Sequence, residues 1–104
     1  MKVPEIKRGQ WLIIRVDGTE EPMEGRPSIY EVYQALGCEC IDTVSLVKDS
    51  SGQALVVMIV DDTGMIDRKP VNPKATAMMR FTARGILPCA IHGDVALVND
   101  EDFA

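Results

Sequence analysis

Four residues of the chain have the chemistry to bind a metal ion together, namely Cys38, Cys40, Cys89 and His92. Three thiolates and one imidazole are a ligand set for structural zinc, and a metal would help to stabilise a domain of this size. The spacing weakens this interpretation, because zinc ribbons usually carry two cysteines separated by two residues on a tight turn. The favoured alternative is three reduced cysteines that pack as small apolar side chains, with one histidine at a turn.

A second candidate lies in the stretch KPVNPKATAMM, residues 69 to 79. Asn72 has the side chain of a helix N-cap, and Pro73 suits the first helical position, where its missing N–H costs no hydrogen bond. The free N–H groups at such a helix start also favour an anion. Asn72 therefore has two interpretations, a helix cap or a contact to a ligand, and the cap is sufficient to explain it.

No residue pattern typical of catalysis occurs in the sequence. His92 is the only histidine, and neither a nucleophile elbow nor a metalloprotease spacing surrounds it. Asp61 and Asp62 precede a Thr-Gly turn, but the acidic spacing of a calcium loop is absent. We therefore expect a protein that is not an enzyme and that uses no cofactor.

The composition is that of one globular domain, residues 1–104, with 46% apolar and 26% charged residues. No apolar run approaches the roughly 18 residues of a membrane span, and residues 1–10 lack the apolar core of a secretory signal. We expect a cytoplasmic protein that does not bind a membrane. The net charge of −5 argues against direct binding to nucleic acid, which usually requires a basic surface.

The elements that position these residues follow from the apolar pattern. It predicts strands at 11–16, 40–47, 54–62 and 95–98, with the second and third forming an antiparallel hairpin. A capping box formed by Ser28 and Glu31, followed by Gly37, predicts a helix over 28–36. A second helix is predicted to begin at Asn72 and to end at Gly85.

This order of elements predicts an α+β fold, with a small four-stranded antiparallel or mixed sheet and both helices on one face. The segment 54–62 is apolar at nearly every position, which favours a central strand covered on both faces. Residues 19–27 are predicted to be a loop. Residues 1–10 are expected to form an N-terminal extension, and residues 99–104 an acidic tail.

Several ordered motifs give the chain a family resemblance from about Ile13 to Val98. They are a helix ending ALG, then CIDTVSL, VDDTGMI, KPVNPKAT and HGDVALV. This series resembles a family of small proteins of unknown function found mostly in bacteriophages, plasmids and their bacterial hosts, with Pro-x-Asn-x-x-Ala-Thr and Gly-Asp-Val motifs. The resemblance implies signature positions at Asn72, Ala75, Thr76, Gly93 and Asp94. It implies no reaction, and it does not call for the three cysteines.

Three hypotheses of function follow. The first is a small, acidic, non-catalytic protein of a phage or mobile element that binds a host protein and inhibits a defence system such as restriction or CRISPR. The second is a small-ligand or signalling-nucleotide binding protein that uses Asn72, Thr76, Gly93 and Asp94. The third and weakest is a zinc-stapled structural module. The outer strands of so small a sheet could also pair with a second copy, giving a homodimer.

Overall fold

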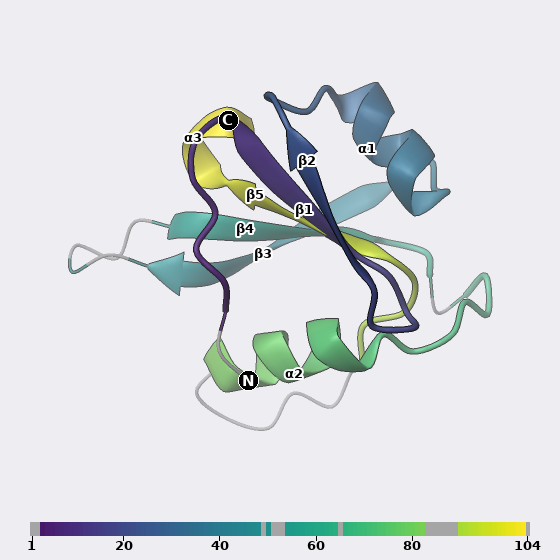
Figure 1. The fold of residues 1–104 in the computed structure, drawn as a ribbon. Helices are drawn as coiled ribbons and strands as arrows, with labels where there is room; N and C mark the ends of the chain where they lie inside the picture. Colours follow the sequence, from purple (N-terminus) through teal and green to yellow (C-terminus); the bar gives the residue numbers. More distant parts are fainter. Residues whose placement is uncertain (1–2, 49, 51–53, 65, 83–89, 104) are drawn as a thin grey trace.

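A computed structural model describes residues 3–48, 50, 54–64, 66–82 and 90–103 of the chain (Figure 1). Its elements, in chain order, are β1 (Gln10–Ile14), β2 (Glu20–Glu24), α1 (Ile29–Leu36), β3 (Ile41–Lys48), β4 (Ala54–Asp61), α2 (Pro73–Thr82), β5 (Val95–Asn99) and α3 (Asp100–Phe103). The strands form one sheet in the order β2-β1-β5-β4-β3, and all neighbouring pairs are antiparallel. The predicted α+β class and the predicted β3–β4 hairpin are confirmed.

The sheet has five strands rather than the predicted four, because the segment expected to be a loop contains the edge strand β2. Pro22 lies opposite Leu12 of β1. Three positions further along the same ladder, Gly9 and Gly25 form a hydrogen-bonded pair, in which the Gly25 amide donates to the Gly9 carbonyl at 2.8 Å. Hydrogen-bonded pairs alternate along an antiparallel ladder, so the missing N–H of Pro22 falls on the side that faces away from β1. At an edge the proline therefore costs no ladder bond.

The helices α1 and α2 lie on opposite faces of the sheet, which corrects the prediction that both cover one face (Figure 1). On the α1 face the buried core consists of Trp11, Ile13, Val32, Leu36, Val57, Ile59, Ala96 and Val98. On the α2 face it consists of Ile6, Ile14, Leu46, Val56, Met58, Val60, Ala75, Met78, Met79, Val95 and Leu97. Successive side chains of β4 and β5 alternate between these two clusters, so both faces need a cover, which one layer of helices cannot supply.

The local signals at the start of each long helix act as the sequence predicts. The Ser28 hydroxyl accepts a hydrogen bond from the Glu31 amide, and the Glu31 carboxylate accepts one from the Ser28 amide. Gly37 ends α1 in the left-handed conformation, at φ 62°. The Asn72 side chain accepts a hydrogen bond from the Ala75 amide at the start of α2. The predicted end of that helix, Gly85, lies outside the described residues.

The two terminal segments contact each other. Ile6 is buried in the core of the α2 face, and its carbonyl accepts a hydrogen bond from the Asn99 side chain. The Gly9 amide donates to the carboxylate of Asp102, in the short helix α3, at 2.7 Å. In the described part of the chain, no helix has the length and apolar character needed to cross a membrane.

Candidate functional site

The predicted site residues meet where β1 ends, α2 begins and the chain enters β5, and Asn72 is the centre of this junction. Its side chain is fully buried. The Nδ2 group donates to the carbonyls of Ile14 and Gly93, both at 3.0 Å, while Oδ1 caps Ala75 at 3.1 Å. Both amide hydrogens and one oxygen acceptor position are therefore used within the protein.

The other three predicted residues belong to the same network. The Thr76 hydroxyl accepts a hydrogen bond from the Ile91 amide at 2.9 Å. The Gly93 amide donates to the Pro70 carbonyl, and the residue has a positive φ of 88°. Asp94 accepts from the backbone amide of Val16 and from the Arg15 guanidinium, both at 2.9 Å. The structure thus brings Asn72, Thr76, Gly93 and Asp94 together, and hydrogen bonds made by three of their side chains and by the Gly93 backbone hold three chain segments in place.

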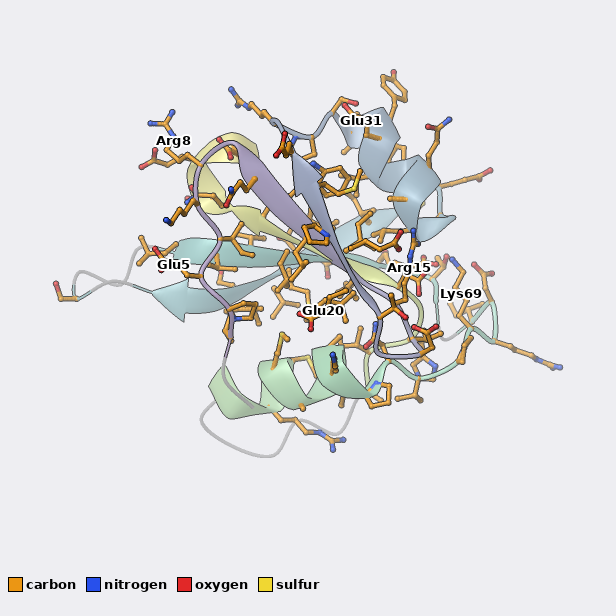
Figure 2. The ribbon with its side chains drawn as sticks, viewed as in Figure 1. Glu5, Arg8, Arg15, Glu20, Glu31 and Lys69 are labelled. Carbon is orange, nitrogen blue, oxygen red and sulfur yellow. The ribbon has the colours of Figure 1, made fainter. Side chains whose placement is uncertain are left out.

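Two cations beside the junction stabilise the carboxyl end of α1, which has no basic residue in its own last turn (Figure 2). Arg15 donates to the Ala35 carbonyl at 2.6 Å, and Lys69 donates to the Gly37 carbonyl at 2.8 Å. Positive charge at a helix carboxyl end offsets the partial negative charge of its free carbonyls. Arg15 also pairs with Glu21, and this hydrogen bond, with smaller contributions from Asp94, raises the pKa of the guanidinium.

Lys69 forms an ion pair with Asp61, whose side chain is 1% exposed, with 2.5 Å between nitrogen and oxygen. Burial on its own raises the pKa of the Asp61 carboxyl. The hydrogen bond and charge of Lys69, together with hydrogen bonds from Thr63, outweigh burial and hold that pKa below its usual range. The same pair raises the pKa of Lys69. Asp61, which lies at the end of the predicted strand 54–62, is therefore a structural anchor for the loop that leads to α2.

A shallow cleft of about 270 Å³ lies beside the junction. It is lined by Val16, Leu36, Gly37, Lys69, Pro70, Gly93 and Asp94. Its two charged side chains are already paired, Lys69 with Asp61 and Asp94 with Arg15. A ligand at this cleft would have to compete with these ion pairs, so the junction has the character of a structural support.

The proposed zinc ligands are only partly described. Cys89 lies outside the described residues, Cys40 is exposed and Cys38 is half-buried. Burial, followed by the nearby Asp61 carboxylate, raises the pKa of the Cys38 thiol and favours its protonated form. The His92 ring nitrogen Nδ1 lies 2.8 Å from the Lys69 carbonyl, a position in which it donates. Within the described ranges, no three His, Cys, Asp or Glu residues gather closely enough to hold a metal ion.

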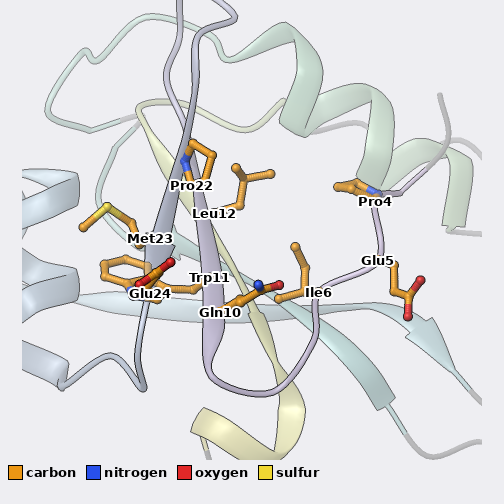
Figure 3. A pocket seen from close by; sticks show the side chains of 9 residues that line it. All are labelled: Pro4, Glu5, Ile6, Gln10, Trp11, Leu12, Pro22, Met23 and Glu24. Carbon is orange, nitrogen blue, oxygen red and sulfur yellow. The ribbon is translucent and has the colours of Figure 1, made fainter.

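Two clefts flank β2 at positions that the sequence did not predict. The first, which we call the α1-side cleft, measures about 340 Å³ and is lined by Trp11, Ile13, Arg15, Glu21, Met23, Glu31, Gln34 and Ala35. The second, the N-terminal cleft, measures about 240 Å³ and is lined by Pro4, Glu5, Ile6, Gln10, Trp11, Leu12, Pro22, Met23 and Glu24 (Figure 3). Figure 3 shows β2 on one side of β1 and the N-terminal segment, with Pro4, Glu5 and Ile6, on the other side.

Trp11 and Met23 line both clefts and lie opposite each other in the β1–β2 ladder. Trp11 is 2% exposed, and within the described residues its indole N–H has no hydrogen-bond acceptor. Met23 is 36% exposed. An aromatic ring and a flexible thioether give the clefts an apolar floor that can adapt to different side chains.

The rims of the two clefts are acidic. Glu21 and Glu31 line the α1-side cleft, and Glu5 and Glu24 line the N-terminal cleft. Of these four carboxylates, only Glu21 has a cationic partner in the described part of the chain. No sequence motif marks these positions, because they are contributed by the N-terminal segment, an edge strand and a helix. The signal that was present in the sequence is the acidic stretch at 17–25.

Comparison of the chain with family models, with curated proteins and with solved structures gives no match.

Proposed function

We propose that the protein is a non-catalytic binding protein, and that its two clefts beside β2 bind a segment of a partner protein that carries lysine or arginine. The observation that carries this proposal is the pair of clefts that share an apolar floor and have carboxylates at their rims. The resemblance to phage and plasmid proteins supports a partner from the host cell. Inhibition of a host defence protein is the biological role that this proposal favours.

The charges of the clefts support a basic partner. Arg15 is already engaged by Glu21, Asp94 and the Ala35 carbonyl, so its charge is offset within the protein. Glu5 and Glu24 are exposed and form no ion pair among the described residues. A lysine or arginine side chain can contact a carboxylate at the rim while its aliphatic part packs on the apolar floor of the cleft. Such charge complementarity accelerates association and selects against acidic partners.

The junction at Asn72 supports a different role. Its side-chain groups bond within the protein, so binding a nucleotide there would require internal hydrogen bonds to break. An unpaired buried polar group costs about 1–3 kcal/mol. We therefore assign the binding function to the β2 clefts and a supporting function to the junction.

The experiment is affinity capture of host proteins on the immobilised full chain, with two charge-reversal variants run in parallel. Glu5→Lys with Glu24→Lys changes the N-terminal cleft. Glu39→Lys with Asp62→Lys produces the same net charge at exposed positions that line neither cleft. We expect a stoichiometric partner on the wild type and on the second variant, and weaker retention of that partner on the first, whose α1-side cleft keeps Glu21 and Glu31.

A partner retained equally by both variants would contradict the assignment to the clefts. If the wild type recovers no stoichiometric partner, the proposal of a protein-binding function is itself contradicted. Circular dichroism of both variants is required first, because a loss of fold would also abolish capture.

A further inference from the structure

The two edges of the sheet differ in their capacity to add another strand. At the β2 edge, Pro22 removes a donor, and Glu20, Glu21 and Glu24 surround it with negative charge. Proline and charge are both devices that block edge-to-edge pairing. The β3 edge (Ile41–Lys48) contains no proline, and its ladder with β4 is regular from Ile41 to Ser45, beyond which the register shifts. The regular part of the β3 edge, from Ile41 to Ser45, is therefore the one suited to pairing.

The register shows which β3 groups face outward. The Asp62 amide donates to the Cys40 carbonyl, and Thr43 lies opposite Ile59 in the same regular ladder. Hydrogen-bonded pairs alternate along that ladder, so the N–H and C=O groups of Ile41, Thr43 and Ser45 point away from β4. No other segment of the described chain pairs with this side of β3. Thr43 and Ser45 are exposed, on the α1 face.

We propose that the β3 edge binds a second copy of this chain, with the two strands antiparallel about a two-fold axis at Val44. The occupant follows from the residues of β3 itself. In this register the backbone of Thr43 in one copy is hydrogen-bonded to the backbone of Ser45 in the other copy, and the two-fold axis repeats this pair. Val44 of one copy faces Val44 of the other across the axis. Paired hydroxyl residues and paired β-branched residues both favour cross-strand contact. The result is one continuous ten-stranded sheet, twice the five strands of a single copy.

Charge selects this register over its neighbours. Asp42 is the only charged residue between Ile41 and Leu46. An axis at Asp42 would place the two carboxylates directly opposite, and an axis at Thr43 would leave them diagonal at about 7–8 Å. With the axis at Val44 they lie four residues apart along the strands, roughly 13 Å, which exceeds the Debye length of about 8 Å at physiological salt.

Asp42 also controls access to the edge. Its carboxylate accepts a hydrogen bond from the Thr43 amide at 2.8 Å, and Thr43 is one of the residues whose amide points outward. The second copy must displace this carboxylate before its own carbonyl can bond to Thr43. Asp42 therefore weakens pairing without preventing it, and its removal should tighten the dimer.

The first experiment is sedimentation equilibrium of the full chain at protein concentrations up to about 1 mM. We expect a concentration-dependent shift from the monomer mass of 11.4 kDa to twice that value. Asp42→Ala should lower the dissociation constant about two- to tenfold, the range of one net hydrogen bond. Thr43→Pro should abolish association, because the amide it removes makes no bond to β4. Thr43→Val keeps that amide and should still associate.

A second experiment tests the register and does not depend on a proline variant that folds. In a chain whose three cysteines are replaced by alanine, Val44→Cys should form an intermolecular disulfide, because facing residues in such a pair have Cα atoms about 4.5 Å apart. Thr43→Cys should not, because the two Thr43 positions are offset by two residues, beyond the roughly 7 Å limit.

A wild type and an Asp42→Ala variant that both remain monomeric at the highest concentration would overturn the proposal. Equal cross-linking of the Val44→Cys and Thr43→Cys variants would overturn the register. High salt should strengthen this association, because each copy carries a net charge of −5. Binding at the acidic clefts should weaken with salt, so the two surfaces are distinguishable.

Discussion

Replacing Asn72 is expected to destabilise the protein far more than the loss of a helix cap alone. Asn72→Ala removes the cap at the Ala75 amide, which contributes about 1 kcal/mol. It also leaves two buried carbonyls, those of Ile14 and Gly93, without a donor. At about 1 kcal/mol or more for each, the total loss is about 3–5 kcal/mol. The free energy of unfolding of a domain this size is about 5–15 kcal/mol, so the loss is a large fraction of it.

Asn72→Ser separates the two contributions. Serine keeps the cap but cannot reach both carbonyls, so we expect it to lose about 2–3 kcal/mol. Urea unfolding followed by circular dichroism measures these differences. The matched control is Asn99→Ser, because Asn99 also accepts from one amide and donates to one carbonyl but is only half-buried. An Asn72→Ser variant as stable as the wild type, or no less stable than Asn99→Ser, would refute the reasoning.

Three further predictions concern the residues around the junction. The pKa of Asp61 is lower in the folded protein than in the unfolded chain, so its ion pair with Lys69 stabilises the fold above about pH 4. This contribution to stability is lost as the pH falls through the lowered pKa. Acid unfolding of Asp61→Asn, compared with the wild type, should therefore depend less on pH below about pH 4. Gly93→Ala should cost at least about 1–2 kcal/mol in urea unfolding, because its φ is positive and the new Cβ would lie 3.1 Å from Lys69 Cδ. Arg15→Met should lower the melting temperature more than Arg8→Met. The Arg8–Glu101 pair is exposed, whereas Arg15 bonds to two carboxylates and to the carboxyl end of α1. Equal effects of the two variants would contradict this role for Arg15.

The local part of the fold is readable from the sequence because its signals lie within one or two turns of chain. The capping box at Ser28 and Glu31 and the cap at Asn72 need only neighbours three residues away. The buried strand β4 is readable from its continuous apolar run. The same run implied a cover on both faces of the sheet, and the prediction of helices on one face did not satisfy that requirement.

The remaining features depend on partners that are distant in the sequence. The strand β2 has the sequence EEPME, which lacks apolar alternation, and only its pairing with β1 makes it a strand. The carbonyls that hold the Asn72 amide group are 58 and 21 residues away. Asp102, in the segment expected to be a tail, is fixed by an amide 93 residues away. No local pattern encodes these contacts, so the β2 clefts could not be predicted.

Trp11 provides a direct measurement of whether the acidic clefts beside β2 bind basic segments. It is the only tryptophan and lines both clefts. Its fluorescence would be followed while a short arginine- and leucine-containing peptide is added, with the matching glutamate- and leucine-containing peptide as the control. We predict a saturable change with the basic peptide alone, weakened by salt and reduced in the variant that combines Glu5→Lys with Glu24→Lys. Equal responses to both peptides, or an undiminished response in that variant, would contradict the account.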